Sequence, residues 1–247
     1  MKIWEGTYPD FASINPGIPA NHAPEEWVEK SLSRLEQVRQ HDGKVVAELF
    51  SSNPLAILPP LIDLVSRSER AIITDVGGNL GQLYNWVTRW VSPHFIDWHI
   101  VEKPELLSHP KVRENLNPVI GWHLELASAP VMTNLLFFGS SIQYIENLED
   151  DVLPFLKRAA PKWVVVGDAM TGESIPTFVT RQNYFDSFFP SKFRNLRELL
   201  ETFRESGYDC VSQEEAVSRA NASYYPSAGL PPGLQIDFPL DLIFLKR

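Results

Sequence analysis

A glycine-rich turn carries the clearest chemical signal in this sequence. The stretch Asp75-Val-Gly-Gly-Asn-Leu-Gly81 follows a short apolar run and precedes an amphipathic segment that begins at Gln82. This is the pattern of a strand, a tight turn and a helix. Glycine lets the backbone turn sharply and approach a ligand closely, and a helix start presents unpaired N–H groups and a positive dipole end. The turn therefore predicts a site for a nucleotide-type cofactor.

Further polar residues stand where other strands are predicted to end. Glu102 follows the second predicted strand, Ser140 and Ser141 follow the fourth, and Asp168 ends the fifth. Ligands of open parallel sheets bind at the carboxyl ends of the strands, near the point where the strand order reverses. We therefore expect these residues to lie with the glycine-rich turn around one site.

The elements that hold these residues alternate between strands and helices. The predicted strands cover residues 72–76, 97–101, 119–124, 134–138, 163–166, 208–213 and 237–245. The predicted helices cover residues 24–40, 44–51, 59–65, 82–91, 150–160 and 194–206, and residues 106–115 are short helical or irregular. Such alternation predicts a parallel sheet with helices on both faces, and a last strand without a crossover helix can pair antiparallel.

The predicted fold class is α/β, a three-layer Rossmann-like sheet of seven strands, mostly parallel with the last strand antiparallel, behind a helical N-terminal extension. Residues 1–70 would form an arm and helical extension packed on the core, and residues 71–247 the sheet domain. Prolines indicate that residues 1–23 are irregular, although their apolar side chains are expected to pack on the body. Residues 171–193 form a long aromatic insertion, which we expect to be a loop.

Composition limits the classes of function. The 247 residues carry a net charge of −9, which disfavours nucleic acid as a partner because its binding needs a basic face. The single cysteine excludes an internal disulfide and a cysteine zinc cluster. No apolar run approaches the ~20 residues of a membrane span, and the first residues lack a signal-peptide pattern. These features predict a cytoplasmic protein without integral membrane association, and no residue spacing marks a metal site.

The spacing of the glycines separates the cofactor classes. A dinucleotide site needs G-x-G-x-x-G, but Asn79 and Gln82 stand where the second and third glycines of that pattern belong. No Lys-Ser or Lys-Thr follows Gly81, so a phosphate-binding loop of the P-loop type is absent. The pattern acidic-x-Gly-x-Gly-x-Gly fits from Asp75 to Gly81, with Asn79 replacing the middle glycine. This pattern is typical of class I methyltransferases, which bind S-adenosylmethionine.

Four stretches resemble a family of uncharacterised bacterial methyltransferases. They are Asp75-x-Gly-Gly-x-x-Gly81, Val101-Glu-x-Pro104, Phe138-Gly-Ser-Ser-Ile-Gln-Tyr-Ile145 and the terminal strand pair that starts at Gly207-Tyr208. The early Trp4-x-Gly6-x-Tyr8 is also similar to that family's N-terminal signature. Members are often associated with surface-polysaccharide biosynthesis. The resemblance implies a class I fold and S-adenosylmethionine as cofactor, and it supplies no known acceptor.

The residues expected to bind the cofactor are Asp75, Gly77, Gly78, Asn79, Gly81, Glu102, Lys103, Ser140, Ser141 and Gln143. Asp75 would orient the turn or reach the methionine amino group, or it would simply cap the next helix. Glu102 would accept both ribose hydroxyls, or it would be a surface carboxylate. Lys103 would line the adenine.

Three residues are candidates for catalysis. An oxygen acceptor needs a general base, for which His22 and Asp168 are the candidates, and Tyr144 either faces the acceptor or packs. The insertion 171–193 forms part of an acceptor pocket or lid, a homodimer contact, or plain packing, and the residues leave these open.

The sequence thus predicts transfer of a methyl group from S-adenosylmethionine, which leaves S-adenosylhomocysteine, to a small-molecule or glycan-linked acceptor. A nicotinamide (NAD)-dependent oxidoreductase on a Rossmann fold and a non-catalytic cofactor-binding module are the alternatives.

Overall fold

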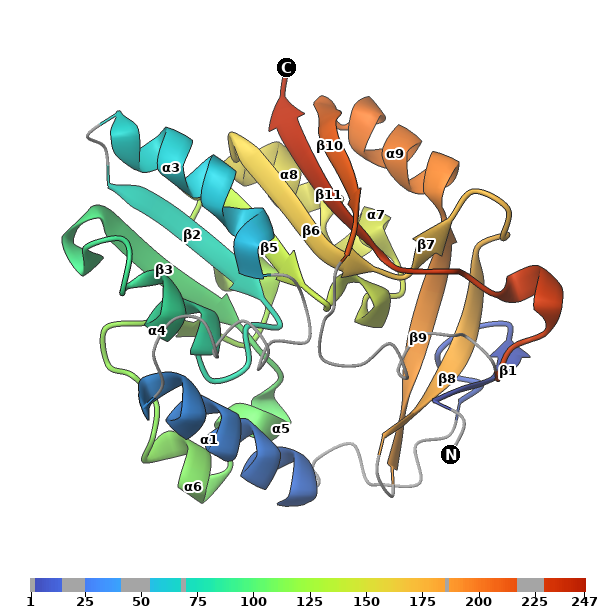
Figure 1. Cartoon of the computed structure of the whole chain (residues 1–247), viewed down its shortest axis with the longest axis horizontal. Coiled ribbons are helices and arrows are strands. Elements are labelled where there is room, and N and C mark those ends of the chain that lie inside the picture. The colour runs from blue at the N-terminus through green and yellow to red at the C-terminus, as the bar shows by residue number, and fades with distance from the viewer. Residues whose placement is uncertain (1–2, 15–24, 41–53, 68–69, 185–186, 217–228) are drawn as a thin grey trace.

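A seven-stranded sheet forms the centre of this computed structural model, which describes residues 3–14, 25–40, 54–67, 70–184, 187–216 and 229–247 (Figure 1). Its strand order is β10-β11-β6-β5-β2-β3-β4. The strands are β2 (Ala71–Val76), β3 (Ile96–Val101), β4 (Gly121–His123), β5 (Leu135–Gly139), β6 (Trp163–Ala169), β10 (Tyr208–Glu215) and β11 (Leu240–Lys246). The last strand, β11, lies between β6 and β10 and pairs antiparallel with both, while the pairs among β2 to β6 are parallel. The predicted fold class is confirmed.

The order of the strands reverses between β2 and β5. The chain runs from β2 outward through β3 to β4, and then returns to place β5 on the other side of β2. A reversal of this kind opens a crevice at the carboxyl ends of the strands. The glycine-rich turn follows β2 and Ser140 follows β5, so both lie at this reversal.

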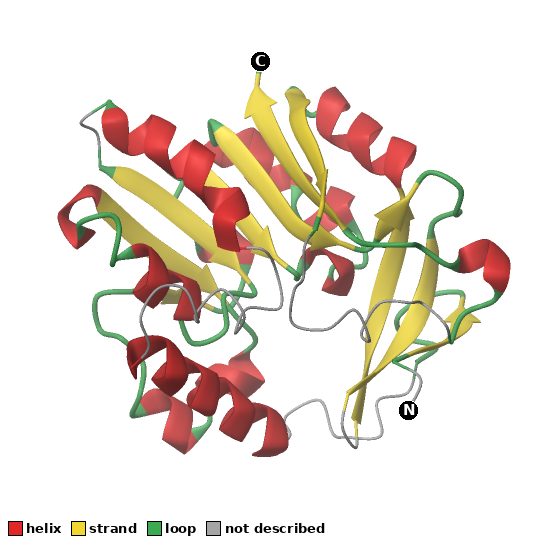
Figure 2. Cartoon of the chain, in the orientation of Figure 1, coloured by secondary structure: helices red, strands yellow, loops and turns green. Residues whose placement is uncertain are grey.

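Helices cover both faces of the sheet, as Figure 2 shows. On one face α3 (Leu58–Ser66) and α4 (Gln82–Val87) pack against Ile73, Leu135, Phe137 and Val165. On the other face α8 (Leu153–Ala159) and α9 (Leu196–Glu205) pack against Leu136, Phe138, Val164 and Val166. The alternation within β5 and β6 follows from the two-residue period of a strand, and burial on both faces explains why these strands are continuously apolar.

A second sheet stands beside the first (Figure 1), although no pattern in the sequence predicted it. Its order is β1-β8-β9-β7. The strands are β1 (Trp4–Tyr8), β7 (Thr171–Gly172), β8 (Phe178–Tyr184) and β9 (Ser187–Asn195). The expectation of an irregular segment over residues 1–23 is therefore wrong for β1, because Pro9 follows the strand and ends it. The expectation of a loop over residues 171–193 is also wrong, because β8 and β9 form an antiparallel hairpin.

Several helices differ in length from their predictions. The helix expected over 82–91 ends at Val87, and its last residues form tighter turns in which Arg89 N–H donates to Trp86 O and Trp90 N–H to Val87 O. The helix expected over 150–160 is divided into α7 (Leu148–Asp151) and α8, which has Pro154 in its first turn. The segment predicted over residues 106–115 overlaps the end of α5 (Pro104–Leu107) and contains α6 (Pro110–Arg113). The helix α1 (Glu25–Gln40) is as predicted, and the predicted helix 44–51 lies outside the described residues.

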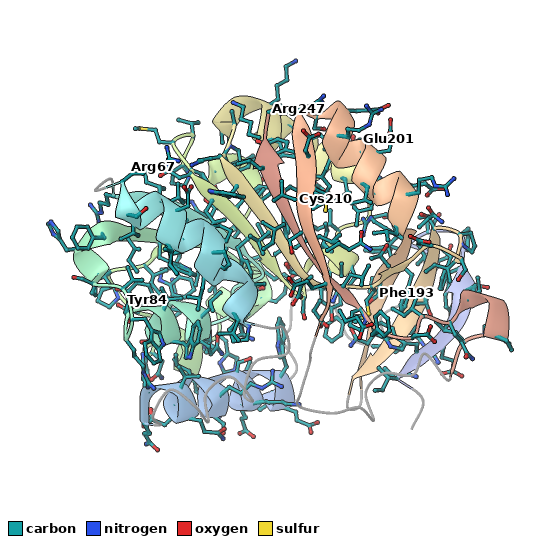
Figure 3. The ribbon with its side chains drawn as sticks, turned by 45° about the horizontal axis from the view of Figure 1, so that its top comes forward. Arg67, Tyr84, Phe193, Glu201, Cys210 and Arg247 are labelled. Carbon is teal, nitrogen blue, oxygen red and sulfur yellow. The ribbon has the colours of Figure 1, made fainter. Side chains whose placement is uncertain are left out.

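Figure 3 separates the two ends of the sheet. Arg67, Glu201 and Arg247 lie along the outer edge at one end, while Phe193 marks the second sheet. Arg247 follows β11, which runs opposite to its neighbours, so it marks the amino ends of the parallel strands. The polar residues described below stand at the opposite end.

Candidate functional site

The glycine-rich turn adopts the left-handed backbone conformation at three alternate positions. Its φ angles are 72° at Gly77, 53° at Asn79 and 80° at Gly81. A Cβ atom at Gly77 would lie 2.6 Å from Ser141 Cβ, and one at Gly78 would lie 2.5 Å from Asp75 Oδ2. Glycine is therefore required at these two positions by close packing, and the turn brings its backbone against the residues that follow β5.

Asn79 occupies the position of the middle glycine and keeps the conformation that glycine would take. Asparagine is one of the few residues with a side chain that tolerate this conformation. Its backbone N–H donates to Glu102 Oε2 at 2.9 Å, and its side-chain Nδ2 donates to Ser31 Oγ of α1 at 3.0 Å. Asn79 Oδ1 is buried without a hydrogen-bond partner. The turn is thus tied to the end of β3 and to α1.

Asp75 is the second-last residue of β2 and lies inside the protein, with 1% of its surface exposed. Burial raises the pKa of Asp75 to about 8, with a further rise from the nearby Glu102 carboxylate and opposition from the neighbouring Trp98 indole. Asp75 Oδ2 is buried and has no partner in hydrogen-bonding geometry, and the same holds for Trp98 Nε1. A buried polar atom without a partner is costly in a folded protein, and a cationic or N–H-bearing ligand at the turn would satisfy it.

Glu102 follows β3 and is held by two backbone donors. Its Oε2 accepts from Asn79 N–H, and its Oε1 accepts from Lys103 N–H at 2.8 Å. Burial raises the pKa of Glu102, and these two hydrogen bonds oppose the rise. Each carboxylate oxygen can accept a further hydrogen bond. Glu102 can therefore receive two donors, such as a pair of neighbouring hydroxyl groups.

The connection after β5 brings further polar groups to the same edge. Ser141 Oγ donates to Val76 O at 2.5 Å, and Gln143 Nε2 donates to Ser140 O at 2.7 Å. Gln143 Oε1 is buried without a hydrogen-bond partner. Tyr144 extends toward the second sheet, where its hydroxyl donates to Gln182 Oε1 at 2.6 Å.

Asp168 lies at the carboxyl end of β6, one residue before the strand ends at Ala169. Its φ is 57°, as is that of Ser140 on the adjacent strand end, and Ser140 Oγ donates to Asp168 Oδ2. The backbone N–H of Asp168 donates to Asp241 Oδ1 at 2.9 Å. Left-handed conformations cost energy for residues other than glycine and cluster at functional sites. Asp168 is 1% exposed, and its contact with Ser140 places it beside the connection after β5.

The structure thus brings together the predicted residues at the carboxyl ends of β2, β3, β5 and β6. Lys103 belongs to the same edge, because it directly follows Glu102 and its Nζ lies 5.5 Å from the centre of the Phe189 ring. His22 lies outside the described residues and stays a prediction. Among the described residues, no group of His, Cys, Asp and Glu is arranged to hold a metal ion, and no helix is long and apolar enough to span a membrane.

The sequence did not predict that α1 contributes to the site. Ser31 accepts the hydrogen bond from Asn79, and the Trp27 ring of the same helix lies 6.0 Å from the ring of Phe189. A serine within an amphipathic helix is ordinarily an exposed polar residue. The available signal was its position, because Ser31 stands three residues after Val28 and four before Leu35, on the buried stripe.

No protein-family model matches the chain, and no curated protein matches it in sequence. Solved structures match it in overall fold. A Burkholderia thailandensis 1,6-didemethyltoxoflavin-N1-methyltransferase, crystallised with 1,6-didemethyltoxoflavin and S-adenosylhomocysteine, covers 98% of this chain and 99% of its own, with 14% identity and a TM-score of 0.48. An S-adenosylmethionine-dependent methyltransferase of Mesorhizobium loti covers 77% and 98%, with 14% identity and a TM-score of 0.47. The CcbJ methyltransferase of Streptomyces caelestis covers 78% and 90%, with 11% identity and a TM-score of 0.48. At these values the likeness says nothing about the ligand of this chain.

Proposed function

We propose that this chain is an S-adenosylmethionine-dependent methyltransferase. The observation that carries the proposal is the position of β11, which lies antiparallel between β6 and β10 in an otherwise parallel sheet. The class I methyltransferase sheet ends in such a pair, and dinucleotide-binding sheets usually do not. The turn after β2 also follows the acidic-x-Gly-x-Gly-x-Gly pattern, with Asn79 in a glycine conformation.

The polar atoms at the turn fit the parts of this cofactor. Glu102 has one acceptor position left on each oxygen, which suits the two ribose hydroxyls. Asp75 Oδ2 is buried without a partner, which suits the amino group of the methionine part. Gly77 and Gly78 let the backbone of the turn approach Ser141 and Asp75 closely, and Ser140, Ser141 and Gln143 supply short polar contacts after β5. When bound, the cofactor supplies an electrophilic methyl group on a sulfonium.

Methyl transfer needs an acceptor held in line with the methyl group, and the protein supplies mainly position and desolvation. The acceptor's lone pair forms the new bond to carbon while the carbon–sulfur bond breaks toward sulfur. An O–H acceptor also loses a proton, and we propose the Asp168 carboxylate as the group that takes it. The contact between Ser140 and Asp168 fixes that carboxylate at the end of β5 and β6. Tyr144 would contact the acceptor from the side of the second sheet.

The acceptor that we propose is a small or glycan-linked molecule. The net charge of −9 supports this choice over nucleic acid, which binds to basic surfaces. The resemblance of the Phe138–Ile145 stretch to a family associated with surface polysaccharides supports a carbohydrate-linked acceptor.

The decisive experiment is calorimetric titration with S-adenosylhomocysteine. Wild type is expected to bind, and Glu102→Ala is expected to bind at least about tenfold more weakly, because hydrogen bonds to charged groups contribute about 1.5–3 kcal/mol. Glu114→Ala removes an exposed carboxylate of α6's C-terminal end and is expected to bind like wild type. Absence of binding in wild type would overturn the proposal, and unchanged affinity in Glu102→Ala would remove the ribose assignment alone.

Two alternatives are separated by related measurements. A nicotinamide-dependent oxidoreductase predicts that NAD, and not S-adenosylhomocysteine, raises the melting temperature. A non-catalytic binding module predicts binding of S-adenosylmethionine with no methyl transfer to any acceptor tested.

A further inference from the structure

We infer that Ser31 of α1 is a positioning residue for the cofactor, which it holds through Asn79 and Glu102. The inference rests on the proposed function and extends it to a helix outside the sheet. Asn79 connects three elements, because its backbone contacts the carboxylate after β3 and its side chain contacts α1.

The contact between α1 and the turn is built from polar and apolar parts. Besides the hydrogen bond from Asn79 Nδ2 to Ser31 Oγ, Gln82 Nε2 donates to Ser31 O at 3.3 Å, and Gln82 Oε1 accepts from Leu80 N–H at 3.1 Å. Ser31 is 2% exposed and Leu80 1%. The apolar part is a cluster of buried side chains from α1, the turn, α5 and α6: Val28, Leu35, Leu80, Leu106 and Val112. The turn is therefore held against α1 by hydrogen bonds at Ser31 and by apolar contacts with Val28 and Leu35, which lie before and after it.

These contacts explain how an asparagine can replace the middle glycine. The left-handed conformation costs an ordinary L-residue roughly 1–2 kcal/mol, and less where a side-chain hydrogen bond compensates. Ser31 supplies that compensation by accepting from Nδ2 of Asn79. As a result, the N–H of Asn79 points at Glu102 Oε2.

The orientation of Asn79 matters for the cofactor because Glu102 depends on it. The buried Glu102 carboxylate accepts one backbone N–H at each oxygen. Without the N–H of Asn79, Oε2 would lose its partner and the carboxylate could rotate. The two remaining acceptor positions would then no longer meet two ribose hydroxyls together. Ser31 acts through Asn79 and does not itself touch the carboxylate.

The test is a double-mutant cycle in binding of S-adenosylhomocysteine, with Ser31→Ala, Asn79→Gly and the double variant. Ser31→Ala is expected to raise the Kd about fivefold, the size of one lost hydrogen bond. Asn79→Gly removes the side chain and restores a residue that adopts the turn conformation freely. In that background Ser31→Ala is therefore expected to change the Kd less than twofold. Ser31→Thr keeps the hydroxyl and is expected to recover most of the affinity.

Ser33→Ala is the matched control. Its exposed hydroxyl lies on the same helix and accepts from Gln37 Nε2 at 3.1 Å, so the variant removes a hydrogen bond that does not reach the turn. A purely structural role for Ser31 would lower the melting temperature and leave the Kd unchanged, and this result would overturn the inference. An equal effect of Ser31→Ala in the Asn79→Gly background would also overturn it. If wild type binds no S-adenosylhomocysteine, the proposed function itself fails, which is a separate outcome.

Discussion

Asp75 carries its carboxyl group where ionisation is costly. Its pKa is raised to about 8 from 3.8, first by burial and then by the charge of Glu102. Because the pKa is higher in the folded chain than in the unfolded chain, the folded state binds the extra proton between these two values. The stabilising effect of that proton is complete below pH 3.8 and is lost as the pH rises through about 8.

Asp75→Asn has a neutral side chain of the same shape, so its stability lacks this dependence on pH. We expect the stability of the variant relative to wild type to increase by up to about 1.4 kcal/mol per pH unit through this window. Thermal unfolding of both proteins without ligand, from pH 5 to pH 9, measures the difference. A difference that does not change with pH would show that Asp75 ionises normally in the folded protein.

Local patterns predicted the positions of these residues but not their contacts. The apolar run before Asp75 and the glycines after it mark a strand and a turn, because both signals span a few neighbouring residues. The partner of Asn79 is Ser31, which lies 48 positions away in the chain, and no local pattern identifies such a pair. The left-handed conformations of Ser140 and Asp168 were also not predictable, since neither residue type requires them.

The β8–β9 hairpin reaches the proposed cofactor site through Phe189. Its ring contacts Trp27 of α1 and Lys103, whose backbone N–H donates to Glu102. Phe188 precedes it on the opposite face of the strand, where its ring lies 5.1 Å from the Arg181 guanidinium. The two adjacent phenylalanines therefore differ in what they contact.

Phe189→Ala is expected to weaken binding of S-adenosylhomocysteine about two- to fivefold, because an exposed cation–π contact contributes about 0.5–1 kcal/mol and its loss frees Lys103. Phe188→Ala is the matched control and is expected to leave the affinity unchanged. Calorimetric titration of both variants makes the comparison. Equal affinities for the two variants would mean that the hairpin does not support the cofactor site.

The second sheet illustrates what the sequence could not reveal. Its strands come from residues 4–8 and from residues 171–195, so pairing joins segments that are far apart in the chain. Proline is disfavoured within strands, yet Pro190 lies within β9, opposite Arg181 in the hairpin. By contrast, the main sheet was predictable because its apolar strands alternate regularly with helices.

The N-terminal extension and the main sheet contribute side chains to the same buried core. Ala56, Ile57, Leu61 and Leu64 belong to the same buried cluster as Ile73, Leu135 and Val165. Asp63 of α3 accepts hydrogen bonds from Lys162 Nζ at 2.5 Å and from Trp163 Nε1 at 2.8 Å. The Lys162 contact is the largest cause that lowers the pKa of Asp63 to about 2. The division at residue 70 therefore marks a change of secondary structure, and we expect no separate folding unit on either side of it.

Unfolding in urea tests this expectation. Because the core is shared, unfolding of the extension would expose apolar side chains of the sheet, so the two parts are expected to unfold together. Far-UV circular dichroism and tryptophan fluorescence are expected to give coincident transitions. The first follows all helices, and the second includes Trp4 and Trp27 of the extension as well as Trp98 and Trp163 of the sheet.

Asp63→Ala is expected to lower the midpoint of unfolding, with a loss of roughly 1–2 kcal/mol because its contacts are partly open to solvent. Glu36→Ala, an exposed change on α1, is expected to leave the midpoint unchanged. A first transition that removes helical signal while S-adenosylhomocysteine still binds would show that the extension folds independently of the site. Such a result would also contradict the role of Ser31, because α1 could then leave the turn without loss of the cofactor.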